Sequence, residues 1–553
     1  MGAYLNPGFA YFEACTKGFF IDKTELISFI DRKLGTKESL MLVSRPRRFG
    51  KTLAARMLSA YYGSGYDSRR LFENRRIAKL DPSLTGINSY HVLFLDVSSF
   101  WTQVKTWQSK ENEESREANR TPRQLDWIWE LVKDMEADLI KSFGESVKGR
   151  DLYETLENIV EVTGKKFLWI CDEWDMFFRE ACPDPHVQRN YLEFLRRLFK
   201  SGDYTLKVFI GAYMTGILPM KKIKGQSAIS DFSEYSMLLP RDLSSFYGFT
   251  QDEVKIICKK ENLPLAETEK WYDGYQIGPM TSIYNPKSIA ELVANRIFTS
   301  YWSKSASYAS LEDYIKLNIP GTRDIVIDLL RGIPVKISDP EIFQNDLFNM
   351  KQPNEILTAL VHLGYLTYDY YTGNVRIPNL EVRREFFNSL SDDSWADTLE
   401  KIHEADSLLE ATWQGEEEKV ATSLEKLHAE RGDSLKYNSE ARLSEAVQMA
   451  YYTAGNYYVR IFELASGTGY VDIAFIPRPG KAVPPMIVEL KWDKPANAAI
   501  QQIKERGYID KIKAFAYHGE VLLVGITYNS KSRGKDAKKH RCIIEKMTVT
   551  ISS

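Results

Sequence analysis

The chain has 553 residues, of which 44% are hydrophobic, 12% aromatic and 27% charged. At roughly 150 residues per domain, this length allows about three to four domains. The composition is typical of folded globular domains and excludes a mainly disordered, collagen-like or coiled-coil chain. The 73 Lys and Arg residues nearly balance the 75 Asp and Glu residues, and the formal charge is -2. Any argument for nucleic-acid binding must therefore rest on local charge.

The five cysteines are scattered and form no Cys-x-x-Cys pair, so neither a disulfide scaffold nor a structural zinc site is predicted. No segment approaches the roughly 18 to 20 apolar residues that span a bilayer. The N-terminus also lacks the basic and apolar stretches of a signal peptide. We therefore expect a cytoplasmic protein with no membrane partner.

Residues 40–62 predict a strand, a polar turn and a helix, because an apolar run and a turn precede apolar residues at helical spacing. Within the turn, Gly50, Lys51 and Thr52 match the second half of the phosphate loop GxxxxGK(S/T). Arg45 stands at the first glycine position, so the match is partial. Such loops direct backbone N–H groups and the lysine at the phosphates, and the hydroxyl binds Mg²⁺. The motif predicts ATP bound by these three residues, with Thr52 as a Mg²⁺ ligand.

A second buried strand is predicted by the apolar run 167–170, which precedes Asp172 and Glu173. In a Walker B site, the first carboxylate holds the Mg²⁺ shell and the next polarises the attacking water. Asp172 and Glu173 are the predicted catalytic pair, and Asp172 is also a metal ligand. Either motif alone also fits an ordinary turn, but the two motifs in this order favour nucleotide binding.

Two more apolar runs, 91–100 and 205–217, predict further strands of a doubly wound α/β sheet. The second run contains Thr215, at the position where a polar sensor of the γ phosphate often lies. Residues 102–125 are polar and highly charged, and we interpret them as an exposed insertion outside the sheet.

The middle of the chain, from about 246 to 395, alternates helical patterns with short apolar stretches. Its last part, 357–386, predicts a helix, a hairpin and a helix, as in a winged helix. We interpret the region as the helical lid and coupling module of the ATPase. For the wing, around 370–376, plain packing between two domains is the favoured interpretation, and direct DNA contact is the alternative. The Tyr-Asp-Gly-Tyr block at 272–275 receives no catalytic role.

The C-terminal third predicts a helix at 442–455, a hairpin at 457–477 and a strand at 484–493. This is the order of a restriction-endonuclease-like α/β core. Glu489 and Lys491 lie on the same side of the last strand, because side chains of a strand alternate between its faces.

Asp472 in the hairpin completes a D…ExK pattern with Glu489 and Lys491. Two carboxylates on neighbouring strands can hold Mg²⁺ or Mn²⁺, while the lysine orients the nucleophile or neutralises charge. All three are predicted catalytic residues, with Asp472 and Glu489 as metal ligands. The same spacing also arises by chance in amphipathic strands, which is the alternative interpretation.

Local charge in this third favours a polyanionic partner. Between Lys481 and Arg541 there are thirteen Lys and Arg residues against six Asp and Glu residues, most densely in 531–541. We expect nucleic acid as the partner and favour DNA over RNA. An ordinary solvated loop is the alternative.

Blocks spread over nearly the whole chain resemble the bacterial AAA-ATPase-like family, whose members carry a C-terminal PD-(D/E)XK nuclease-like domain. The blocks are GFFIDKT (18–24), SRPRRFGKT (44–52), CDEWD (171–175), FYGFTQDEV (246–254), WYDGYQIG (271–278), YNPKSI (284–289), LGYLT (363–367) and IPNLEV (377–382). The family is similar in replacing the first glycine of the loop, which accounts for Arg45. We therefore include Arg47, Arg48 and Phe49 among the nucleotide-binding residues.

The resemblance also extends to the C-terminal site. It implies roles for Glu463 and Gly469 before the catalytic aspartate, and for Gln502 on a helix behind the site. The chain departs from the family pattern at Trp174, where tyrosine is usual, and at Tyr470, where arginine is usual.

These patterns predict an AAA-type P-loop ATPase domain over 1–245, a helical lid and winged-helix-like module over 246–395 and a PD-(D/E)XK nuclease-like domain over 396–553. We expect ATP binding and hydrolysis to regulate Mg²⁺-dependent cleavage of nucleic acid. The alternative is a nucleotide-driven switch whose C-terminal domain binds nucleic acid or protein without cleaving it. The sequence places no arginine finger, so a second copy or a protein partner is a candidate source.

Overall fold

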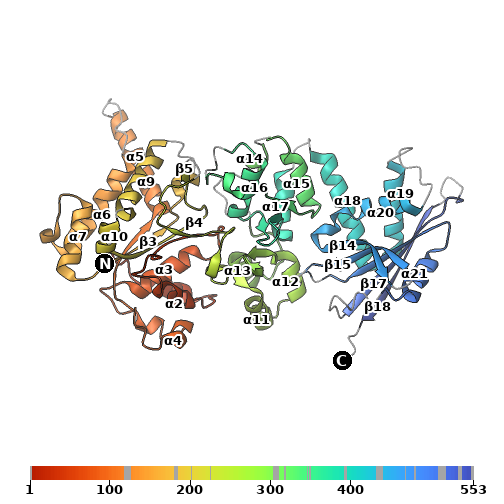
Figure 1. Cartoon of the computed structure of the whole chain (residues 1–553), viewed down its shortest axis with the longest axis horizontal. Coiled ribbons are helices and arrows are strands. Elements are labelled where there is room, and N and C mark those ends of the chain that lie inside the picture. Colours follow the sequence, from red (N-terminus) through yellow and green to blue (C-terminus); the bar gives the residue numbers. More distant parts are fainter. Residues whose placement is uncertain are drawn as a thin grey trace.

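The computed structural model of the chain is elongated, with its two five-stranded sheets at opposite ends (Figure 1). Figure 1 shows the N-terminal sheet at one end, a second large sheet at the C-terminal end and mostly helical structure between them. The structure describes residues 3–117, 126–179, 185–200, 202–223, 226–302, 311–316, 319–345, 347, 350–390, 395–430, 440–466, 469–478, 481, 483–508, 519–532 and 538–549.

The N-terminal sheet has five parallel strands in the order β2-β3-β4-β1-β7. Their bounds are β1 Leu40–Ser44, β2 His91–Asp96, β3 Phe167–Asp172, β4 Phe209–Gly216 and β7 Ser233–Tyr235. The order runs out of sequence, as expected when helices connect parallel strands across both faces. The predicted doubly wound α/β class is therefore confirmed.

Alternate residues of β1 face two different hydrophobic cores, because successive side chains of a strand point to opposite faces. Met41 and Val43 pack in one core, and Leu40 and Leu42 in the other. The first core includes residues from α1 Ala10–Thr16, α2 Glu25–Asp31, α3 Lys51–Tyr62 and α4 Arg76–Leu80. The second includes residues from α5 Val97–Glu117, α6 Trp127–Phe143, α7 Leu152–Thr163, α8 Met176–Arg179, α9 Pro185–Phe199 and α10 Gly202–Val208.

Two sequence predictions in this region were wrong at their boundaries. The run 205–217 contains the end of α10 before β4 begins at Phe209, and residues 97–117 form helix α5. Helix α5 forms because Val97, Phe100, Trp101 and Val104 recur at helical spacing and are all buried in the second core. The predicted insertion is therefore helical up to residue 117, and its remainder, 118–125, lies outside the described residues.

The middle of the chain is mainly helical and contains two small three-stranded sheets. The predicted helix, hairpin and helix are observed as α16, β12 with β13, and α17. The helices are α11 Gln251–Glu261, α12 Leu265–Tyr272, α13 Pro286–Asn295, α14 Leu311–Lys316, α15 Thr322–Leu330, α16 Pro353–Leu363 and α17 Leu380–Ser389. The strands of these sheets are β8 Phe249–Thr250, β9 Tyr275–Ile277, β10 Met280–Tyr284, β11 Val335–Lys336, β12 Thr367–Tyr368 and β13 Asn374–Arg376. Before them, β5 Lys222–Ile223 and β6 Gln226–Ser227 form a separate two-stranded sheet.

The C-terminal sheet has the order β14-β15-β16-β17-β18 and is antiparallel except for the β16–β17 pair. The predicted order of helix, hairpin and strand is confirmed as α20, β14 with β15, and β16. The elements are α18 Ala396–Gln414, α19 Glu417–Glu430, α20 Glu440–Ala450, β14 Tyr458–Ser466, β15 Gly469–Pro477, β16 Met486–Trp492, α21 Ala496–Glu505, β17 Gly519–Tyr528 and β18 His540–Val549.

Helix α18 belongs to two cores. Ile402 in its first half packs in the core that includes the middle helices, whereas Leu408 and Leu409 pack in the core of the C-terminal sheet. The helix therefore joins the middle of the chain to the C-terminal unit. Within the described part of the chain, no helix is long and apolar enough to cross a bilayer.

Candidate nucleotide and nuclease sites

The phosphate loop connects β1 to α3, and its geometry depends on one glycine. Gly50 has φ 91°, a left-handed conformation that glycine adopts without the strain of a Cβ. Helix α3 begins at the next residue, Lys51, whose ammonium donates hydrogen bonds of 3.0 Å to the carbonyls of Arg45 and Pro46. Burial lowers the pKa of Lys51, and the nearby carboxylates Glu173 and Asp172 oppose this shift.

Arg45, at the first glycine position of the motif, is fully buried and supports the loop from the protein interior. Its guanidinium donates hydrogen bonds of 2.8 Å to the carbonyls of Ser44 and Tyr235 and lies 5.2 Å from the ring centre of Tyr247. Burial lowers its pKa to about 10. The arginine thus replaces a glycine without occupying the space in front of the loop.

Polar side chains gather where β2, β3 and β4 end. Asp96 and Asp172 are paired in register on neighbouring strands, and the Thr215 hydroxyl donates to Asp172 Oδ1. Burial and the charge of Glu173 raise the pKa of Asp172 to about 6, while hydrogen bonds from Thr215 and Thr52 oppose the rise. The structure therefore brings together three predicted residues, Thr52, Asp172 and Thr215.

Glu173 is held beside this group by Arg179, which sequence reasoning missed. Arg179 forms ion pairs with Glu173 and, at 2.8 Å, with Asp175. Burial acts to raise the pKa of Glu173, but the positive charges of Arg179, Lys51 and Arg47 outweigh it and hold the pKa below its ordinary value. Glu173 therefore remains ionised. The Asp175–Arg179 spacing of four residues on one helix face was the available sequence signal.

A cavity of about 590 Å³ lies in front of the phosphate loop. The predicted residues in its wall are Arg47, Arg48, Gly50, Lys51, Thr52, Asp172 and Glu173. Tyr11, Asp96, Ser98 and Lys287 also line it and were not predicted. Asp96 could have been found from sequence, because it ends an apolar strand as Asp172 does. Phe49 does not line this cavity; it is buried, with its ring edge-on to Tyr275 at a centroid distance of 5.1 Å.

An apolar pocket of about 250 Å³ adjoins this cavity and shares Gly50, Leu53 and Lys287 with it. Its other lining residues are Phe19, Phe20, Ile21, Lys23, Leu26, Phe49, Ala54, Met57, Phe246, Gly248, Phe249, Pro286 and Ala290. Sequence reasoning missed the pocket because its walls come from four segments that are distant along the chain.

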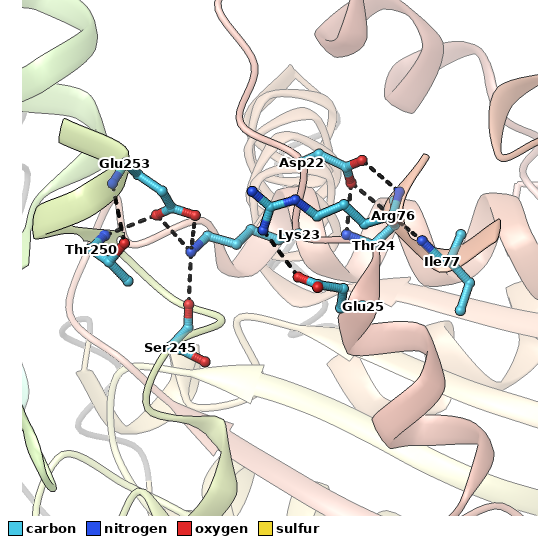
Figure 2. Close-up of polar contacts among 9 residues, drawn as sticks. All are labelled: Asp22, Lys23, Thr24, Glu25, Arg76, Ile77, Ser245, Thr250 and Glu253. Carbon is cyan, nitrogen blue, oxygen red and sulfur yellow. Dashed lines mark hydrogen bonds and ion pairs between the residues drawn. The ribbon is translucent and has the colours of Figure 1, made fainter. Parts of the chain in front are cut away.

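Lys23 of this pocket belongs to the Asp22-Lys23-Thr24 segment. Figure 2 shows that this segment makes polar contacts with the start of two helices, α4 and α11. Asp22 accepts a hydrogen bond of 2.8 Å from the N–H of Arg76, and the Thr24 hydroxyl accepts one of 3.0 Å from the N–H of Ile77, at the start of α4. Lys23 instead donates to the carbonyl of Ser245 at 2.8 Å and forms an ion pair of 2.7 Å with Glu253.

The C-terminal candidate site lies on neighbouring strands β15 and β16. Asp472 Oδ2 accepts a hydrogen bond of 2.7 Å from the N–H of Leu490. Glu489 Oε1 accepts from Lys491 Nζ at 2.9 Å and from the amide of Gln502 on α21. Burial and the charge of Asp472 raise the pKa of Glu489 to about 7. The structure thus brings the three predicted catalytic residues together with Gln502.

One atom of this site is suited to a cation. Glu489 Oε2 is buried and has no hydrogen-bond partner in the described part of the chain, so an oxygen ligand is available there. In the same part of the chain, no group of three or more His, Cys, Asp and Glu side chains is arranged to hold a metal. A Mg²⁺ ion at Asp472 and Glu489 would therefore take its remaining oxygen ligands from water, substrate or backbone. The side chains of Glu463 and Tyr470 lie outside the described residues, and so do residues 467–468, which precede Gly469.

Comparisons with known proteins define two domains of this chain. Residues 10–224 match the sequence model of a family described as a predicted AAA-ATPase. Residues 444–538 match that of the PD-(D/E)XK nuclease superfamily. The chain therefore carries a predicted AAA-ATPase domain followed by a PD-(D/E)XK nuclease superfamily domain, as the resemblance implied.

Individual relatives are distant. An uncharacterized protein in the vnfD 5′ region of Azotobacter chroococcum mcd 1 is 24% identical over 399 residues, which cover 67% of this chain and 70% of that protein. Cdc6p from Pyrobaculum aerophilum is 11% identical, with 66% of this chain and 92% of that one covered and a TM-score of 0.23. The ORC2 protein from Aeropyrum pernix is 12% identical, with 73% and 96% covered and a TM-score of 0.26.

Proposed function

We propose that the N-terminal domain binds ATP with Mg²⁺ in the cavity in front of the phosphate loop and hydrolyses it. The observation that carries this proposal is the convergence of Lys51, Thr52, Asp172 and Glu173 on one cavity. Lys51 binds the phosphates, and Thr52 with Asp172 would hold Mg²⁺, which neutralises phosphate charge when bound. Glu173, kept ionised by Arg179, accepts the proton of the attacking water.

The adjoining apolar pocket supports a nucleotide rather than a simple phosphate as the ligand. It opens beside the loop, shares three residues with the phosphate cavity and is lined mainly by aromatic and aliphatic side chains. A purine base requires such a surface, because its faces are apolar. Phe49 lines this pocket, so we retain its predicted role in nucleotide binding and propose that it contacts the base.

For the C-terminal domain we propose Mg²⁺-dependent or Mn²⁺-dependent cleavage of nucleic acid. Asp472 and Glu489 would hold the metal, which activates water when bound. Lys491 lies 2.9 Å from Glu489 and is suited to neutralising charge that develops on the phosphate. DNA is the favoured substrate.

The hairpin between α16 and α17 has the exposed side chains that a wing in contact with DNA requires. Tyr370 and Tyr371 are 48% and 72% exposed, whereas Arg376 donates a hydrogen bond inward to the Gly274 carbonyl.

The regulatory arrangement is also part of the proposal. We assign ATPase, lid and nuclease roles to residues 1–245, 246–395 and 396–553, and we expect a cytoplasmic protein in which ATP controls cleavage. One observation favours the alternative of a switch that does not cleave: Lys491 and Gln502 already occupy Glu489 Oε1. If Arg47 does not act as the arginine finger, we propose that a second copy of the chain or a protein partner supplies one.

The proposed ATP site is tested with Lys51→Ala in the full chain. Loss of the ammonium should weaken ATP binding at least tenfold while the far-UV circular dichroism of the fold is retained, because the hydrogen bonds of Lys51 within the described residues go to loop carbonyls. Binding is measured by titration with a fluorescent ATP analogue. Normal binding and turnover in this variant would refute the site.

The proposed nuclease activity is tested by measuring cleavage of plasmid, linear DNA and structured RNA with Mg²⁺ or Mn²⁺, with and without ATP. Asp472→Asn should abolish cleavage, because it removes a metal-binding charge. The matched control is Asp493→Asn: Asp493 follows β16 with φ 51°, a conformation that asparagine tolerates, and is exposed. No cleavage of any substrate by the parent, with ATP turnover intact, would favour the non-cleaving switch.

A further inference from the structure

Helix α17 contacts the phosphate loop through a short chain of hydrogen bonds. Arg48, on the wall of the phosphate cavity, donates to the carbonyl of Tyr301 at 3.1 Å. The N–H of Tyr301 donates to Glu381 Oε1 at 2.7 Å, and the Ser288 hydroxyl donates to Glu381 Oε2 at 2.8 Å. Glu381 is 1% exposed, so water does not compete for these bonds.

Arg383, two residues further along α17, contacts the C-terminal unit. Its guanidinium forms a bidentate pair with Asp406 of α18, with N–O distances of 2.6 and 3.2 Å. It also donates to the carbonyl of Leu330 at 3.1 Å, and the same carbonyl accepts from the Asn456 amide at 3.1 Å. The Arg383 side chain is 6% exposed. A planar, bidentate pair of this kind fixes orientation as well as distance.

The helical geometry explains how both contacts form at once. Successive residues of an α-helix are rotated by about 100° around its axis. Glu381 and Arg383 are two residues apart, about 200°, so they project from roughly opposite sides of α17. The N-cap of the helix is also fixed, because the Asn379 side chain accepts from the Val382 N–H and donates to the Tyr272 carbonyl. Both contacts are made by one helix of ten residues, so a displacement of α17 on the Glu381 side would also displace Arg383.

We propose that α17 transmits the nucleotide state of the phosphate loop to the nuclease-like domain, through Arg48, Tyr301 and Glu381 on one side and Arg383 and Asp406 on the other. Arg383 and Asp406 act as positioning residues and touch no substrate. The inference rests on the proposed function, because it requires a nucleotide in the cavity. It adds the route by which that nucleotide affects a domain at the other end of the molecule.

The route is tested by amide hydrogen exchange of the full chain, with and without Mg²⁺ and ATP. Peptides from α3, at the phosphate loop, report nucleotide binding itself. Peptides from α18 report transmission, and their exchange rate should change at least threefold on nucleotide addition. This measurement needs no cleavage assay, so it separates the inference from the nuclease proposal.

Two aspartates of α18 provide a matched pair of variants. Asp406→Ala removes the partner of Arg383, and it should abolish the nucleotide effect on α18 while the effect on α3 persists. Asp397→Ala is the control, because Asp397 lies on the same helix with an 81% exposed side chain and forms an ion pair with its neighbour Lys401. It should retain both effects. Asp406→Asn, which preserves the side-chain shape, replaces the alanine variant if that one does not fold.

The ratio of cleavage rates with and without ATP provides a second measurement. Whichever direction ATP acts in the parent, this ratio should come within twofold of one in Asp406→Ala and keep the parent value in Asp397→Ala. A response at α3 with none at α18 in the parent would overturn the inference and leave nucleotide binding standing. A nucleotide effect on α18 that survives in Asp406→Ala would also overturn it. No response at α3 would refute the proposed ATP site, and the inference with it.

Discussion

At the scale of single residues, the ATPase candidate site is organised by charge placed in a dry environment. Asp172, Glu173 and Asp175 follow one strand closely, and burial favours the protonated form of each. Arg179, with a side chain 1% exposed, pairs with the second and third of them. The arginine thereby keeps Glu173 ionised. Burial and the charge of Glu173 raise the pKa of Asp172, so neighbouring carboxylates acquire different roles.

This difference yields a prediction for Glu173→Gln. The amide is nearly isosteric but cannot accept a proton, so ATP hydrolysis should slow by about 10²- to 10⁴-fold while ATP binding persists. Turnover is measured by phosphate release and binding by fluorescence titration. Glu193→Gln, at an exposed position on α9, is the control and should behave as the parent. Loss of binding in Glu173→Gln would instead indicate a structural role in holding Arg179.

At the scale of elements, the Asp22-Lys23-Thr24 segment holds two helices at once (Figure 2). Glu253, the partner of Lys23, is also the third residue of α11 and forms a capping box with Thr250. One carboxylate therefore serves both the start of α11 and its attachment to the N-terminal domain. Lys23 also lines the apolar pocket beside the loop.

We expect Lys23→Met to lower the free energy of unfolding by about 1–3 kcal/mol, because it keeps the apolar stem but removes the cation paired with Glu253 and the donor to the Ser245 carbonyl. Chemical denaturation measures the change. Lys17→Met is the matched control, since Lys17 is 73% exposed and lies 4.0 Å from Glu13; its effect should stay below about 0.5 kcal/mol. Equal effects of the two substitutions would contradict a structural role for the Lys23 pair.

The elements also show where sequence patterns succeed. The buried strands β1 and β3 and the C-terminal order of helix, hairpin and strand follow from apolar runs and spacing. Helix α5 was not recognised, because two of its four buried apolar residues, Val97 and Phe100, fall in the run 91–100 predicted as a strand, and charged residues dominate the composition of 102–125. Average polarity is thus a poor guide wherever one face of a helix is buried.

At the scale of the whole molecule, buried histidines link stability to pH. His362 of α16 is 1% exposed, and burial, with the charges of Lys222 and Arg45, lowers its pKa to about 3. Burial likewise lowers the pKa of His91 to about 4. Below a pH of about 6.5 the unfolded chain binds protons that these folded histidines do not, so both contributions to stability are lost as the pH falls.

His362→Leu should make the free energy of unfolding less steeply dependent on pH, by about 1.4 kcal/mol per pH unit between roughly pH 6 and pH 4. Denaturant titrations of parent and variant across pH 4 to 8 measure the difference. Above pH 7 the two profiles should run parallel, which serves as an internal control. Parallel profiles over the whole range would show that His362 titrates alike in the folded and unfolded chain.

The candidate sites illustrate what sequence could and could not predict. Lys51, Thr52, Asp172 and Glu173 come from local motifs, and the structure brings them to one cavity. Phe49 lies in the same motif but faces the apolar pocket, because the ring of Tyr275 packs against it from a segment over 200 residues away. Local spacing cannot encode which side of a loop is covered by a distant element.

The sequence by itself determined the buried strands β1 and β3, the phosphate-loop motif and the D…ExK pattern, because each depends on residues close together along the chain. Only the tertiary structure decided that Arg45 is buried behind the loop, that an apolar pocket adjoins the phosphate cavity and that α17 bridges Arg48 and Asp406. The physical reason is the same in each case: burial and hydrogen bonding join segments far apart in sequence, and their energies are set by the packed environment rather than by the motif.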